Sequence, residues 1–257
     1  MTPEDYWQLY LGSVDENNTY IRTHGRRFQQ TLMQLYPASA PGQRAIEVGT
    51  YGFFLKALRL VSGYDRVDGA IFEPDTPYKI LKRSYPFDPV GEEFELYNTN
   101  LECECLPFSE PVYDYVLAPE ILEHMPVDPM GFMMELNRIT KPDGRLLLTT
   151  PNIACAENIF RILWRQVPNN YYVYRSGRHS DRHNLEYGPD LLWKLVENSG
   201  FAIERIWTED SWNSQRPEVG RLISEAGFPP ELRGDNLFVQ CKKTGPVKER
   251  FPVFLYD

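Results

Sequence analysis

Long apolar runs, cysteines and excess basic charge are all scarce in this chain of 257 residues. No run approaches the roughly 20 apolar residues that cross a bilayer, and the first ten residues, MTPEDYWQLY, lack a basic-then-apolar signal pattern. The four cysteines form no recognisable disulfide framework or zinc site. We therefore expect a soluble cytoplasmic protein without a membrane span.

The charge balance bears on the kind of partner. The formal net charge is -9, whereas proteins that bind nucleic acid present clustered Lys and Arg to the phosphates. Nucleic acid is therefore excluded as the expected substrate. With 42% hydrophobic and 14% aromatic residues, the chain can bury one substantial core and an attached cap.

Two strand-like runs separated by a helix mark the fold class. The runs are YDYVLA at 113–118 and RLLLTT at 145–150. Between them, Asp128 can cap a helix that Pro129 begins, and residues 141–144, Lys-Pro-Asp-Gly, suit a turn. This alternation predicts an α/β protein with a doubly wound sheet.

Short motifs that occur in one order at compact spacing identify a family. They are Leu106-Pro107-Phe108, Tyr113-Asp114, Glu120-Ile121-Leu122-Glu123-His124, Lys141-Pro142-Asp143-Gly144 and Thr150-Pro151-Asn152. The set resembles class I S-adenosylmethionine-dependent methyltransferases, especially those acting on small molecules and sugars, in detail over residues 43–152 and more loosely to about residue 207. The resemblance implies a Rossmann-like sheet of seven strands, mostly parallel with an antiparallel last strand, and S-adenosylmethionine as cofactor.

The first cofactor motif follows the strand expected at 44–48. Glycines there let the backbone approach a ligand, and a helix beginning near residue 53 offers free amides. By resemblance, Glu47 lies under the cofactor, and Gly49, Thr50 and Gly52 line its path. Tyr51 departs from the family pattern, because a glycine is usual there.

The second strand, expected at 66–72, departs from the family at its end. Ile71 occupies the position where the family has an acid that holds the ribose hydroxyls. Glu73, two residues later, is our candidate for that role, and a solvated carboxylate before Pro74 is the alternative.

The next candidates are expected to contact the adenine and the methionine end of the cofactor. Residues 101–106 alternate as a half-buried strand would. By resemblance, Glu102 accepts a hydrogen bond from the adenine amino group, and the backbone amide of Cys103 contacts the adenine ring. The alternative is that Glu102 only lies on the solvent face of the strand. Ala118, with Glu120, would lie against the cofactor's methionine end.

The Glu120-x-x-Glu123-His124 element leaves three roles open. We expect Glu120 and His124, four residues apart, to share one side of a helical turn. His124 could be the general base for a hydroxyl substrate. The arrangement also resembles ubiquinone-biosynthesis O-methyltransferases, in which a divalent cation is associated with these groups; alternatively, His124 only braces the loop.

The segment 153–187 would form a lid between the fifth and sixth strands and decide the substrate. It is dense in aromatic and hydrogen-bonding groups, which suit a polyhydroxylated ligand. His183 is a second candidate base. The candidate substrate contacts are Asn152, Tyr172, Arg178, His179 and Arg182.

Residues 1–40 precede the sheet and are expected to form a helical cap that touches the cofactor carboxylate, with the methyltransferase domain at 41–257. The leading hypothesis is an O-methyltransferase for a small sugar or glycan intermediate. An N-methyltransferase and a catalytically inactive cofactor- or partner-binding protein are the alternatives.

Overall fold

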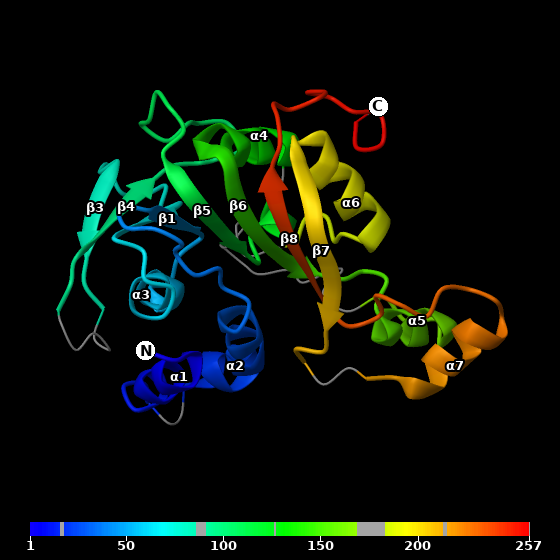
Figure 1. Ribbon diagram of the computed structural model, residues 1–257. Coiled ribbons are helices and arrows are strands. Elements are labelled where there is room, and N and C mark those ends of the chain that lie inside the picture. Colours follow the sequence, from blue (N-terminus) through cyan, green and yellow to red (C-terminus); the bar gives the residue numbers. More distant parts are fainter. Residues whose placement is uncertain (16–17, 86–90, 126, 169–182, 213–214, 257) are drawn as a thin grey trace.

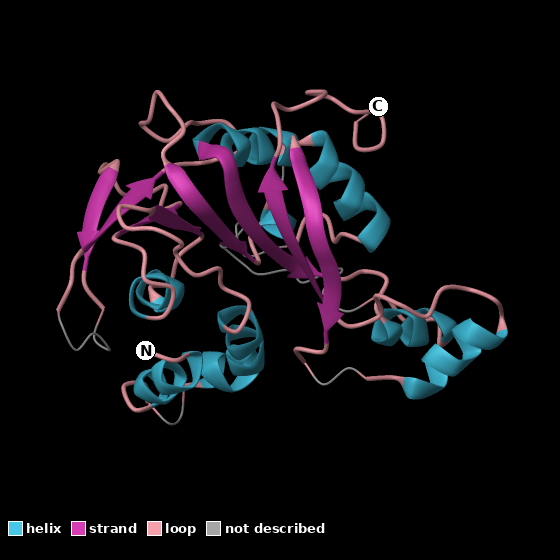
Figure 2. Cartoon of the chain, viewed as in Figure 1, coloured by secondary structure: helices cyan, strands magenta, loops and turns pink. Residues whose placement is uncertain are grey.

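The computed structural model describes residues 1–15, 18–85, 91–125, 127–168, 183–212 and 215–256. An eight-stranded sheet in the order β3-β4-β2-β1-β5-β6-β8-β7 forms its centre (Figures 1 and 2). The strands are β1 Arg44–Val48, β2 Arg66–Ile71, β3 Ile80–Arg83, β4 Phe94–Asn98, β5 Tyr113–Pro119, β6 Thr140–Pro151, β7 Phe201–Glu209 and β8 Asn236–Lys243. The helices are α1 Pro3–Leu11, α2 Thr19–Leu32, α3 Phe53–Leu60, the 3₁₀ helix η1 Leu122–His124, α4 Pro129–Ile139, α5 Ala156–Leu163, α6 Pro189–Asn198 and α7 Pro217–Glu225.

The sheet confirms the predicted doubly wound architecture. β4, β2, β1, β5 and β6 pair in parallel, and the last strand β8 runs antiparallel between β6 and β7. β3, which pairs antiparallel with β4 at the edge, is one strand more than the seven expected. Its residues are alternately exposed and half-buried, so the sequence shows no apolar pattern that predicts this strand.

One predicted strand is misplaced. Residues 101–106 form a turn followed by irregular loop, and the strand lies upstream as β4. The alternation that suggested a strand arises because Leu101 and Leu106 enter the core from a loop while Cys103 to Cys105 face solvent. The predicted turn at 141–144 is an irregularity at the start of β6, where Asp143 has φ 62°.

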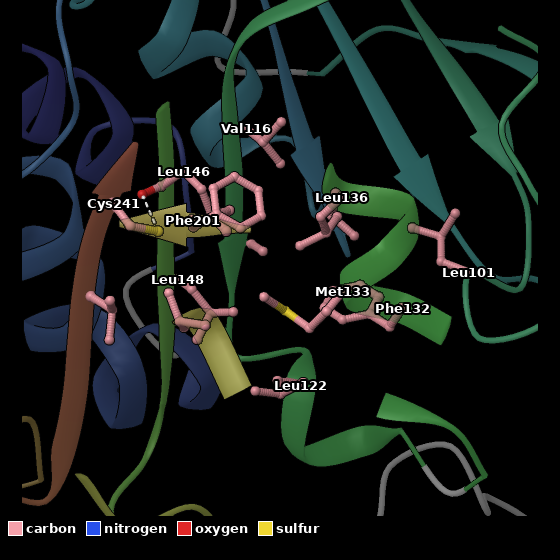
Figure 3. Packing of buried hydrophobic residues seen from close by; sticks show 14 of the residues in the cluster. Leu101, Val116, Leu122, Phe132, Met133, Leu136, Leu146, Leu148, Phe201 and Cys241 are labelled. Atoms are coloured by element: carbon pink, nitrogen blue, oxygen red, sulfur yellow. Dashed lines mark hydrogen bonds between the residues drawn. The ribbon is translucent and has the colours of Figure 1, made fainter. Parts of the chain in front are cut away.

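Helices cover both faces of the sheet. Figure 3 shows one face, where α4 side chains such as Met133 and Leu136 pack against Leu146 and Leu148 of β6. On the other face, α1, α2 and α3 share a second cluster rich in aromatic rings. Within the described residues, no helix is both long and apolar enough to span a membrane.

The carboxyl ends of the parallel strands meet at one edge, which is where ligands bind in such sheets. α2 lies beside this edge: Gln30 accepts a bond from the Ser211 hydroxyl after β7 at 2.7 Å, and Phe28 stacks on Phe53 at the start of α3. Figure 1 shows α2 on one side of this edge and α5 with α7 on the other. Residues of the N-terminal forty therefore adjoin the candidate site, and the domain boundary at residue 40 stays a prediction.

Candidate active site

Glu47 lies fully buried at the end of β1. Its Oε2 accepts bonds from the Thr50 hydroxyl at 2.5 Å and the Leu55 amide at 2.8 Å. Burial raises the pKa of Glu47 to about 7, although these two donors partly oppose the shift. Because its pKa lies near neutral pH, the charge of this hydrogen-bond acceptor depends on the groups that bind beside it.

Gly49 and Gly52 both adopt positive φ, 75° and 89°, which favours glycine. A Cβ at Gly49 would lie 2.8 Å from Cδ1 of Ile121, so the glycine lets the loop after β1 approach the loop after β5. At Gly52 the ring of Tyr85 occupies the space of a Cβ. The two glycines therefore permit close backbone packing at the edge where the family's cofactor path was predicted.

The loop after β2 is fixed by polar contacts. One terminal nitrogen of Arg83 donates to both carboxylate oxygens of Glu73 at 2.8 Å, and both side chains are about two-fifths exposed. Asn98 accepts from the Glu73 amide and donates to its carbonyl. Glu73 thus lies at the strand end as predicted, but an ion pair occupies it, so its ribose role stays a prediction.

Glu102 and Cys103 also carry internal contacts. One carboxylate oxygen of Glu102 accepts the amides of Val127 and Asp128 at 2.8 Å, which fixes the chain entering α4. The Cys103 amide donates to the Asn100 carbonyl at 3.1 Å. An adenine contact would use the second oxygen of Glu102 and require the Cys103 amide to exchange its partner; both roles stay predictions.

Glu120 and His124 do not share a helical turn, contrary to expectation. The 3₁₀ helix begins at Leu122, and Glu120 precedes it in a left-handed conformation with φ 54°. Its carboxylate accepts the Thr149 hydroxyl at 2.8 Å and lies 3.5 Å from Arg27 of α2. The preceding Ala118 is fully buried in β5, so its side chain packs in the core.

The two candidate bases lie together. The rings of His124 and His183 are 5.0 Å apart at a near-perpendicular angle. Asn184 donates to the backbone carbonyls of Glu123 and His124, at 2.7 and 3.1 Å, and so fixes this pairing. Residues 60 apart in the sequence are thereby joined at the carboxyl edge.

A buried carboxylate orients one of these rings. Nδ1 of His183 lies 2.9 Å from Oε1 of Glu186, whose side chain is only 4% exposed. Because a carboxylate only accepts hydrogen bonds, this contact favours the neutral tautomer that has its proton on Nδ1 and its acceptor at Nε2. The arrangement has the geometry of an oriented general base.

A cation site is geometrically available beside this pair. Glu123, His124 and His183 each offer a ligand atom, and these atoms lie within 4.8 Å of one another. Burial and the neighbouring Glu120 raise the pKa of Glu123 well above its usual value, while the Thr150 hydroxyl bonds to it at 2.9 Å. Glu123 therefore resembles a neutral, bonded carboxyl more than a charged metal ligand.

The predicted substrate contacts fall into two groups. Asn152 is 1% exposed, and its amide donates to the carbonyls of Leu232 and Gly234, so it ties the chain after β6 to the loop before β8. A substrate contact for it stays a prediction. The other four, Tyr172, Arg178, His179 and Arg182, lie outside the described residues.

Comparisons with known proteins identify the family. The family model described as "Methyltransferase domain" matches residues 20–206, well over half of the sequence. The chain belongs to this methyltransferase family. A bovine mitochondrial ubiquinone biosynthesis O-methyltransferase is 23% identical over 208 residues, which are 75% of this chain and 53% of that protein. The chain thus spans about half the length of this curated relative.

Solved structures of similar fold are also methyltransferases. A putative methyltransferase from Haloferax volcanii, in complex with the Trm112 activator, has a TM-score of 0.56 at 15% identity and covers 88% of this chain and 92% of its own. An S-adenosylmethionine-dependent methyltransferase from Archaeoglobus fulgidus has a TM-score of 0.55 at 16% identity, over 88% and 100% of the two chains. At such identities they show the fold alone.

The cofactor of this methyltransferase is S-adenosylmethionine. The described residues fit it: a buried acceptor stands at Glu47, a close-packed glycine loop at Gly49, and a buried guanidinium at Arg27. Bound there, it supplies a methyl group on a sulfonium, which is already a good leaving group. The chain must contribute orientation, exclusion of water and, for a hydroxyl acceptor, a proton acceptor.

Two residues of the site were missed from the sequence. Glu186 stands three positions after His183, a spacing that could have suggested an acid beside the base. Arg27 lies within residues 1–40, for which the sequence predicted a cap but no individual site residue. Its signal was a cation on the apolar stripe of a helix, next to Phe28 and four before Thr31.

Substituting Gly49 tests the close approach of the two loops. We expect Gly49→Ala to destabilise the methyltransferase by about 2–4 kcal/mol, because alanine disfavours φ 75° and its Cβ meets Ile121. Adding Ile121→Val removes the colliding Cδ1 and should recover part of that loss in urea unfolding. If Gly49→Ala unfolds at the wild-type urea concentration, the close approach is not required.

Proposed function

We propose that this methyltransferase transfers a methyl group from S-adenosylmethionine to a hydroxyl of a small polyhydroxylated substrate, a sugar or glycan intermediate. The observation that carries the proposal is the His183–Glu186 pair facing His124. A neutral amine needs little help in losing its proton after attack, whereas a poorly acidic hydroxyl benefits from an oriented base. The pair therefore favours O-methylation over N-methylation.

The roles of the chain's own groups follow from this geometry. With S-adenosylmethionine bound, the cofactor would supply the methyl group, and Nε2 of His183 would accept the proton that the acceptor hydroxyl loses. Glu186 holds the imidazole and stabilises its protonated form. His124 packs against His183 and limits its rotation.

Two further observations support the choice of substrate. The bovine relative is by its name an O-methyltransferase, which favours a hydroxyl acceptor. The sequence at 153–187 is rich in aromatic, Arg, His and Asp residues, the types that pack on sugar rings and bind their hydroxyls.

A methyl-transfer screen with isotopically labelled donor tests the function. We expect label in nucleotide sugars or glycan fragments, no label in matched amines, and no loss of turnover with a metal chelator. Labelling of amines alone would replace the proposal by N-methylation. Absence of cofactor binding at millimolar concentration in calorimetry would favour a catalytically inactive protein.

A further inference from the structure

The segment that follows β8 lies beside α4 and α6 (Figure 1). Its Tyr256 hydroxyl donates to Oδ1 of Asp128 at 2.5 Å and accepts the Met130 amide at 3.0 Å. Arg250 donates to the same Oδ1 at 3.1 Å and also to Oδ2. Two side chains that stand 122 and 128 positions away in the sequence therefore hold the residue that caps α4. We call Tyr256 and Arg250 the clamp.

The clamp adds contacts that an N-cap does not require. A capping side chain satisfies an amide of the first helical turn, and Asp128 already accepts the Gly131 amide at 2.9 Å. The bonds from Arg250 are charge-assisted, which makes them stronger than bonds between neutral groups. Val127, just before the cap, is 78% exposed, so burial of its side chain contributes little to fixing the chain. The position of this chain therefore depends on Asp128 and its partners.

The loop at 100–103 packs on the same turn of α4. One oxygen of the Glu102 carboxylate accepts the amides of Val127 and Asp128, both at 2.8 Å. A Cβ at Gly131 would collide with the Glu102 carbonyl oxygen, so the two backbones are in direct contact. A shift of Asp128 would therefore displace the donors that orient the Glu102 carboxylate.

Glu102 is the residue predicted to accept a hydrogen bond from the adenine amino group of the cofactor. Because two amides hold one of its oxygens, the direction of the second oxygen is set as well. We propose that Tyr256 and Arg250 are positioning residues for adenine recognition, since they hold Asp128, whose amide in turn holds Glu102. The inference rests on the predicted adenine contact of Glu102 and not on the proposed hydroxyl acceptor.

Calorimetry with two ligands tests the assignment without requiring turnover. S-adenosylhomocysteine carries the adenine amino group, and S-inosylhomocysteine carries an oxygen in its place. We expect the wild type to prefer S-adenosylhomocysteine by about 10- to 100-fold, because a carboxylate accepts from the amino group and repels the oxygen. Tyr256→Phe should reduce this preference by about 3- to 10-fold, through weaker binding of S-adenosylhomocysteine.

Further variants separate the geometry of the clamp from its charge. Arg250→Gln should reduce the preference as Tyr256→Phe does, whereas Arg250→Lys, which keeps the charge but loses the planar fork, should retain part of it. Lys248→Gln removes an exposed cation of the same segment and, as the matched control, should keep the full preference. In a Glu102→Ala background, Tyr256→Phe should not change the preference further, because the carboxylate on which it acts is gone.

The outcomes distinguish the clamp from the adenine contact. Equal affinity of the wild type for both ligands would remove Glu102 from the adenine, and the inference with it. A wild-type preference that Tyr256→Phe and Arg250→Gln both keep would overturn the clamp alone. Equal weakening of both ligands in these variants, with a lower urea midpoint, would overturn it too, because the clamp would then only stabilise α4. If either variant does not fold, the milder Arg250→Lys decides by the same ratio of affinities.

Discussion

Replacing His183 by glutamine should lower kcat by about 10²- to 10⁴-fold, the usual contribution of a general base. Glutamine preserves polarity and approximate size, but its amide has no basic nitrogen to accept the hydroxyl proton. Cofactor affinity, measured by calorimetry, and KM for the acceptor should stay near the wild-type values.

Two matched variants distinguish the base from its neighbours. Glu186→Gln leaves His183 in place but removes the carboxylate that fixes its tautomer, so we expect a smaller loss of kcat. His124→Asn keeps a polar side chain beside His183 and should cost less than His183→Gln if His124 only braces the pair. If His124→Asn loses more kcat and His183→Gln stays near the wild-type value, His124 is the base and His183 is the bracing residue.

The sequence predicted those strands and helices whose burial in the core leaves a regular apolar pattern. β5, α4 and β6 carry continuous apolar runs or a helical stripe, and the Asp128 carboxylate caps α4 by accepting a hydrogen bond from the Gly131 amide, as the pattern required. β3 is an exposed edge strand, so burial leaves no periodic mark on it. The alternation at 101–106 misled because turns can also bury every few side chains.

The sequence likewise predicted some features of the candidate site and not others. The motif spacing placed Glu47 and His124 at the carboxyl edge, because strand ends in such sheets share that edge. The contact between Arg27 and Glu120 joins residues 93 positions apart and depends on how α2 folds back across the sheet. No local pattern encodes such a distance. Sequence reasoning therefore located the motifs, whereas the pairing of their side chains required the tertiary structure.

Replacing Glu47 by glutamine should remove a pH dependence from stability. Burial raises the pKa of Glu47 from 4.5 to about 7, so between these values the unfolded chain releases a proton that the folded chain keeps. Rising pH thus favours the unfolded state across this window, by about 3 kcal/mol, and has no further effect above it. Glutamine does not titrate, so urea unfolding of Glu47→Gln should lose this decline, whereas Glu225→Gln, an exposed control on α7, should keep it.

Cofactor binding should show the opposite sign at the same residue. An ionised Glu47 accepts hydrogen bonds from ribose hydroxyls or from the ammonium group more strongly than the neutral acid, so wild-type affinity should rise as pH increases through about 7. In Glu47→Gln the Leu55 amide retains an acceptor oxygen, but affinity above pH 7 should fall by about 10- to 100-fold. Calorimetry across this range, with the stability of each variant measured in parallel, checks both signs. A variant that binds S-adenosylmethionine with the wild-type affinity and pH profile would remove Glu47 from the cofactor site.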